Sequence, residues 1–165
     1  MFAAALSTAC GFQPLYGERT GGVPVRQAFG TISVASIPDR VGQLVRNQLI
    51  DALTPLGQPR DPAYVLAVTL TQAKEGVAFR SDEQATRVNV TLGARYALRK
   101  FGGGAIITQG NTRSVAAFNI VRSEFANITA EADAQRRAAR QVADSIALRL
   151  GVHFAGTLGY PRDRR

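Results

Sequence analysis

The chain is poor in the residues on which most catalytic centres depend. Among its 165 residues there are one cysteine and one histidine. A single thiol can neither form an internal disulfide nor build a cysteine-based zinc site. The histidine, His153, has no serine, cysteine or carboxylate motif of catalytic spacing beside it. We therefore expect a protein that is not an enzyme and that holds no metal and no cofactor.

Long apolar runs and lysine are also scarce. After the first ten residues no apolar stretch approaches the roughly 20 residues of a membrane-spanning helix. Basic residues outnumber acidic ones by 20 to 12, and only Lys74 and Lys100 among them are lysine. Arginine binds phosphate and carboxylate groups through two parallel hydrogen bonds, which suits an anionic partner. A GC-rich genome would produce the same bias, so the arginine content alone does not decide between these explanations.

The single cysteine stands in a pattern typical of lipid attachment. Cys10 follows a short run of small and apolar residues, with Thr8 and Ala9 directly before it. Two features depart from a bacterial lipoprotein signal: Ser7 occupies a position where leucine is more usual, and no basic residue precedes the run. We interpret the segment as a truncated signal with Cys10 as the acylated residue. The alternative is a fraying, alanine-rich end with Cys10 as a lone buried thiol.

The length and the apolar content of 45% are those of one globular domain. Period-two alternation predicts three long strands, over residues 63–79, 84–100 and 105–120, and a short β-rich run predicts another strand over 31–37. Helical spacing predicts one helix capped by Asp39 and a second helix from Thr129 to Leu150, with Gly151 as its stop. The expected fold is α+β, in the order βαβββα, with two helices packed on one face of a four-stranded, mainly antiparallel sheet.

The chain is expected to have four parts. We expect a truncated signal segment over residues 1–9, a lipidated tether over 10–30, an α/β sandwich domain over 31–151 and a mobile basic tail over 152–165. Gly102 and the two glycines after it lack the Lys-Ser/Thr of a phosphate-binding loop and are interpreted as a hairpin turn.

Alternation also predicts which side chains face the helices. In the fourth strand Ile106, Ala116 and Phe118 are expected to face inward. The outward side chains of the two last strands include four arginines that form a candidate cationic stripe: Arg87, Arg95, Arg99 and Arg113. Such a stripe would bind phosphates through charge-assisted hydrogen bonds. The alternative is a solvated sheet face kept soluble by arginine.

Several motifs resemble the LptE family of lipopolysaccharide-assembly lipoproteins. They are Ala9-Cys-Gly-Phe-Gln-Pro-Leu-Tyr-Gly, then Ala85-Thr-Arg, and finally Ser123-Glu-Phe-Ala followed by Glu131-x-Asp-Ala. The resemblance implies a lipoprotein of the outer membrane, facing the periplasm, that plugs the LptD β-barrel and helps it to assemble. It also implies contact with lipopolysaccharide on its way to the outer leaflet. Only Cys10 is carried over by motif, whereas the four arginines are assigned from face and charge.

Two other classes of function remain open. A basic α/β module in the cytoplasm could bind nucleic acid, although the outward face of 84–100 has no aromatic side chain for base stacking. An enzyme that acts on periplasmic glycans or lipids would need paired carboxylates in a cleft. The candidates for that role are Glu75, Asp82 and Glu83, which lie in or beside a predicted turn.

Overall fold

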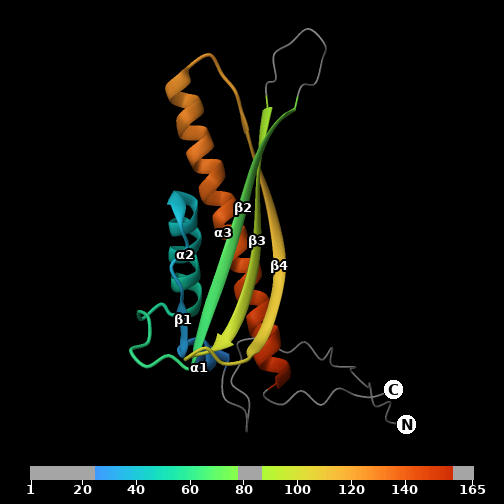
Figure 1. Ribbon diagram of the computed structural model, residues 1–165. Coiled ribbons are helices and arrows are strands. Elements are labelled where there is room, and N and C mark those ends of the chain that lie inside the picture. The colour runs from blue at the N-terminus through green and yellow to red at the C-terminus, as the bar shows by residue number, and fades with distance from the viewer. Residues whose placement is uncertain (1–24, 78–86, 158–165) are drawn as a thin grey trace, which may run out of the picture.

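The computed structural model describes residues 25–77 and 87–157, which form a sheet with helices on one of its faces (Figure 1). The elements, in chain order, are α1 (Val25–Phe29), β1 (Ile32–Val34), α2 (Asp39–Leu53), β2 (Tyr64–Val77), β3 (Arg87–Lys100), β4 (Ile106–Asn119) and α3 (Glu124–Thr157). The expected α+β class and the succession βαβββα are confirmed, with α1 as an additional short helix. Among these helices none has both the length and the hydropathy of a membrane span.

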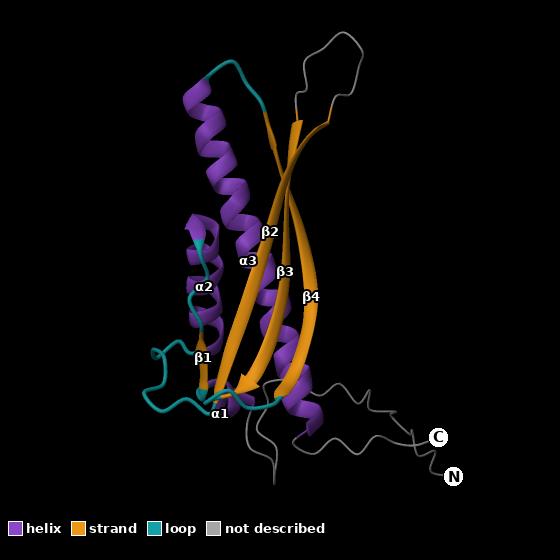
Figure 2. Cartoon of the chain, in the orientation of Figure 1, coloured by secondary structure: helices purple, strands orange, loops and turns teal. Residues whose placement is uncertain are grey.

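The four strands lie in the order β1-β2-β3-β4, and Figure 2 shows α2 and α3 on the same side of the sheet. β2 pairs with β3, and β3 with β4, in antiparallel register along almost their whole length. β1 pairs in parallel with the first three residues of β2. The predicted inward face of β3 is confirmed, because alternate residues from Val90 to Leu98 are buried. The polar residues between them face away from the helices.

The expected inward orientation of Ile106 is wrong. Leu98 pairs with Thr108 but the next residue, Arg99, pairs with Ile106, so Ile107 is an extra residue in a β-bulge. Because the bulge shifts the alternation by one position, Ile107 packs against the core and Ile106 is 42% exposed. The tight hairpin between β3 and β4 is confirmed. Gly102 and Gly103 both have positive φ, a conformation that favours glycine.

The predicted cap of α2 is also wrong. Pro38 occupies the position before the helix, no side chain caps it, and Asp39 itself has a φ of +67°. Near this end the side-chain amide of Gln43 donates a hydrogen bond to the Ile37 carbonyl, at 2.9 Å. The end of the helix is as expected, since α2 stops at Leu53 before the Thr-Pro pair.

Helix α3 is longer than predicted at both ends. Its 34 residues begin at Glu124, where the Ser123 hydroxyl accepts a hydrogen bond from the N–H of Ala126. Thr129, the expected cap, lies inside the helix and donates to the carbonyl of Phe125. Gly151, the expected stop, is buried within the helix, which continues to Thr157. Both expected helix limits are therefore wrong.

The last turns of α3 and the short helix α1 belong to the core, although their residues were expected in a tail and a tether. Phe154 is 5% exposed, and its ring centroid lies 6.3 Å from that of Phe29 and 5.7 Å from that of Tyr64. Burial of an aromatic side chain stabilises the folded state, which a mobile terminus would not do.

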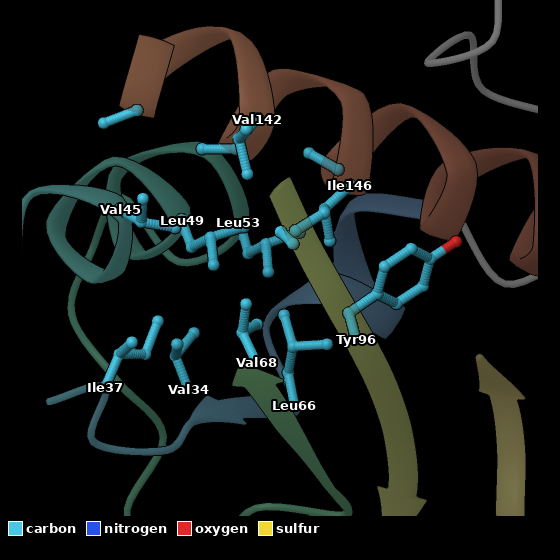
Figure 3. Close-up of a cluster of buried hydrophobic side chains, with 14 of the residues drawn as sticks. Val34, Ile37, Val45, Leu49, Leu53, Leu66, Val68, Tyr96, Val142 and Ile146 are labelled. Atoms are coloured by element: carbon cyan, nitrogen blue, oxygen red, sulfur yellow. The ribbon is translucent and has the colours of Figure 1, made fainter. Parts of the chain in front are cut away.

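The core lies between the sheet and the helix layer. Figure 3 shows apolar side chains of β1, β2 and β3 meeting those of α2 and α3. The buried surface of α3 consists largely of small residues that allow close approach to the sheet and to α2: Ala134, Ala138, Ala139, Ala143 and Ala147. All of this packing uses one face of the sheet, and no helix among residues 25–77 and 87–157 covers the other face.

Candidate functional site

Two groups of residues were predicted to be functional, and they fall in different parts of the chain. Cys10 lies outside the described residues, so its acylation stays a prediction. The four arginines all lie on strands whose positions are described. They occupy the surface that we call the open sheet face, formed by the outward side chains of β2, β3 and β4. Figure 2 shows that the helices lie on the other side of this sheet.

Two of the four arginines are neighbours. In the β3–β4 register Arg95 is opposite Asn111, and Arg113 is opposite Gly93. Arg95 and Arg113 are therefore diagonal neighbours on the same face, a relation in which the two residues are about 7–8 Å apart. An Nη atom of Arg113 lies 3.5 Å from the Thr91 hydroxyl. In this position the guanidinium group of Arg113 is turned toward the Thr91–Val115 pair, on the side of Gly93 that is away from Arg95.

The surface around this pair is accessible and of mixed character, since Gln109 and Asn111 are polar and Val115 is 49% exposed. Arg95 borders a shallow hollow together with Gln109, Gly110 and Asn111. Gly93 leaves room for the side chain of Thr71 at the centre of the face, because a Cβ at position 93 would lie 2.6 Å from the Thr71 hydroxyl oxygen. Sequence alternation did not single out Gly93 or Thr71, since their role depends on which residues of β2 and β4 stand opposite β3.

Arg87 and Arg99 lie on the same face but away from the pair formed by Arg95 and Arg113. Along β3, Arg99 follows Arg95 by four residues and Arg87 precedes it by eight. At the rise of a strand these separations are about 14 Å and about 27 Å. The predicted stripe is therefore one close pair, Arg95 and Arg113, with a single cation toward each end of the sheet.

The open sheet face carries an excess of positive charge. Among the outward positions of β2, β3 and β4, Glu75 is the only carboxylate beside the four arginines. Other acidic residues are used on the helix side of the molecule: Lys74 pairs with Glu131, and Arg137 pairs with Asp133. Within the described parts of the chain no ion pair ties up Arg95 or Arg113. Their guanidinium groups are available to a ligand.

The other classes of site find little support in the part of the chain that the structure describes. Glu75 stands without a second carboxylate on its face, and Asp82 and Glu83 lie outside the described residues. No group of three His, Cys, Asp or Glu residues within the described ranges could hold a metal ion. The outward positions of the three long strands include no aromatic residue on which a base could stack.

Solved structures with the same fold come from several bacteria. A Caulobacter crescentus protein described as a lipoprotein is 26% identical, with a TM-score of 0.68 over 80% of this chain and 96% of its own. A minor lipoprotein of Acinetobacter baumannii is 19% identical, with a TM-score of 0.61 over 81% and 98% of the two chains. Rare lipoprotein B of Shewanella oneidensis is 14% identical, with a TM-score of 0.57 over 77% and 96%.

The comparison with family models agrees with the order of motifs in the sequence. No curated protein sequence matches the chain. The model of the LptE family, described as lipopolysaccharide-assembly, matches residues 29–150. This range runs from the end of α1 through the whole sheet to Leu150 in the C-terminal half of α3. Since the match covers most of the chain and all four strands, the protein is a member of the LptE family of lipopolysaccharide-assembly proteins.

Proposed function

We propose that this protein is a lipid-anchored component of the outer membrane that binds inside the LptD β-barrel, helps it to assemble, and contacts lipopolysaccharide as it moves to the outer leaflet. Its role is structural and in transport, without catalysis. The single observation that carries the proposal is the open sheet face of this LptE-family chain, which presents arginines that no ion pair among the described residues engages.

The shape and composition of the molecule suit the interior of a barrel. The three long strands have 14 residues each, so the sheet is about 45 Å long and could extend along much of a barrel lumen. Barrel interiors are polar, and Thr69, Thr71 and Asn111 on the open sheet face could form hydrogen bonds to such a wall.

The arginine pair suits the phosphate groups of a lipopolysaccharide. A guanidinium group meets a phosphate in a planar, two-bond geometry that lysine cannot reproduce. Arg95 and Arg113 present two such groups on one surface. A ligand with neighbouring phosphates would therefore gain two charge-assisted contacts from this site.

A charge-reversal experiment tests this site. Arg95→Glu with Arg113→Glu is expected to weaken lipopolysaccharide binding by about tenfold or more, because two charge-assisted hydrogen-bonding groups become repulsive. The matched control is Arg140→Glu with Arg149→Glu, which changes the net charge equally on exposed positions of α3. Binding can be measured by titration at low and at high salt.

The control variant is expected to bind within about twofold of the wild type, and the loss in the sheet-face variant should shrink as salt screens the charges. Equal losses in both variants would mean that only net charge matters, and the assignment of Arg95 and Arg113 would then be wrong.

A further inference from the structure

The end of the domain that carries the β3–β4 hairpin exposes apolar side chains. Phe101 at the hairpin is 60% exposed, Val152 near the end of α3 is 57% exposed, and Leu56 in the loop after α2 is fully exposed. Several contacts hold these segments together at one end. The N–H of Phe101 donates to the carbonyl of Ala63 directly before β2, and Phe154 of α3 packs on Tyr64. We call this region the hairpin end.

The same region is positively charged. Its exposed cations lie on α1, in the loop before β2 and at the end of β3, and they are Arg26, Arg60, Arg99 and Lys100. Arg149 on α3 adds a fifth exposed cation, and Asp61 and Asp51, the latter in the last turn of α2, are the carboxylates that accompany them among the described residues. Exposed apolar side chains next to cations are the composition that binds a membrane interface, where rings enter the headgroup layer and cations meet lipid phosphates.

The opposite end of the molecule differs in charge rather than in hydrophobicity. Where β4 passes into α3, Ile120, Val121, Phe125 and Ile128 are all more than 40% exposed. Among the described residues at this end, Arg87 and Arg122 are balanced by Glu75 and Glu124, and Lys74 pairs with Glu131. The two ends are separated by the length of the strands, about 45 Å. Because, of the two ends, only the hairpin end carries a net positive charge among the described residues, an anionic surface would bind that end in preference to the other.

We propose that the hairpin end is a membrane-contacting surface that places Phe101 in the headgroup layer of an anionic phospholipid bilayer. Two observations select a bilayer as the partner. One is the excess of cations, and the other is the position of the chain: the described fold begins at this end with Val25, fifteen positions after Cys10. A connection of that length reaches at most about 50 Å when fully extended, so the opposite end, about 45 Å farther away, lies near the limit of its reach.

In its biological setting the inference rests on the proposed lipid at Cys10, and it concerns the protein before a barrel encloses it. A lipid at Cys10 would hold the chain at the membrane through one point and leave the domain free to turn. A contact through the hairpin end would also fix the long axis of the domain relative to the membrane. The opposite end would then point away from the surface to which the lipid is attached.

Because the chain has no tryptophan, a single introduced tryptophan is a direct fluorescent probe of its position. The full chain with Cys10→Ser removes the acyl group, and Phe101→Trp or Phe125→Trp then places a single indole at either end. Vesicles of phosphatidylethanolamine and phosphatidylglycerol should shift the emission of Phe101→Trp to shorter wavelength and allow quenching by lipids brominated in their acyl chains. The emission of Phe125→Trp should not change.

A charge variant separates electrostatic attraction from hydrophobicity. Arg60→Glu with Lys100→Glu, which leaves the open sheet face intact, should weaken binding to the anionic vesicles by about tenfold or more. Pure phosphatidylcholine vesicles should bind weakly in every case. Equal spectral shifts at both ends, no shift at position 101, or binding that ignores the lipid charge would each overturn the proposal. The experiment uses neither the acyl group nor lipopolysaccharide, so its failure would leave the proposed function standing.

Discussion

Two helical glycines, Gly42 and Gly156, have opposite surroundings at the scale of single residues. A Cβ on Gly42 would lie 2.8 Å from the Ile37 Cγ2 atom and 2.9 Å from the Ile37 carbonyl oxygen. A Cβ on Gly156 would have no neighbouring atom within 4 Å. Glycine at position 42 therefore serves the close approach of α2 to the segment that precedes it.

This difference gives a test on stability. Alanine favours a helix over glycine by about 1 kcal/mol, but at position 42 the clash is with a backbone carbonyl that cannot move freely. Gly42→Ala is expected to lower the free energy of unfolding by about 1 kcal/mol or more. Gly156→Ala should be neutral or slightly stabilising. Urea unfolding of both variants measures the difference, and equal stability would contradict the packing described for Gly42.

Single positions also show where sequence reasoning ends. The alternation of β3 is regular, so the inward residues from Val90 to Leu98 were predictable. Ile106 was misassigned because one extra residue in a bulge reverses every orientation on one side of it. Ile106 and Ile107 have the same propensity for a strand, so only the pairing of β4 with Leu98 and Arg99 decides which of them is buried.

Helix α3 shows the same limit at the scale of elements. Its buried face was predictable from the spacing of Ala138, Val142, Ile146 and Leu150. Its ends were not, because Thr129 and Gly151 are residue types that often cap helices but here lie inside one. Packing of Phe154 against α1 and β2 continues the helix beyond the glycine, and such a long-range contact leaves no local signal in the sequence.

The last turns of α3 can be tested by truncating one side chain. Phe154→Ala is expected to lower the free energy of unfolding by about 3–5 kcal/mol, since it removes a buried ring that contacts Phe29 and Tyr64. The matched control is Val152→Ala, two residues earlier on the exposed side of the same helix, which should cost less than about 1 kcal/mol. Thermal and urea unfolding would report both. A Phe154 variant as stable as the control would mean that these turns do not pack as described.

At the scale of the whole molecule, the open sheet face follows from the order of elements. Two helices that follow β1 and β4 pack on one side, and the chain has no other long helix among the described residues to cover the second side. The sequence predicted this arrangement and placed all four arginines on that face. It did not predict that Arg95 and Arg113 form the close pair, because pair formation depends on the register between β3 and β4.

The proposed anchor is tested by metabolic labelling with a palmitate analogue. The wild-type chain should be labelled and recovered with membranes. Cys10→Ser should carry no label, because the thiol is the acyl acceptor, and should be recovered in the soluble fraction if the lipid supplies most of the membrane affinity. Since Cys10 is the only cysteine, no second thiol can take up the label in its place. An unlabelled wild type in the cytosol would contradict lipidation and favour the nucleic-acid-binding alternative.

The most direct test of the account is co-purification from the outer membrane. An affinity-tagged full chain, extracted in mild detergent, is predicted to retain the LptD barrel in a fixed ratio together with bound lipopolysaccharide. The variant with Arg95→Glu and Arg113→Glu should retain less lipopolysaccharide than the variant with Arg140→Glu and Arg149→Glu. A correctly localised wild-type chain that purifies without any barrel would contradict the central claim.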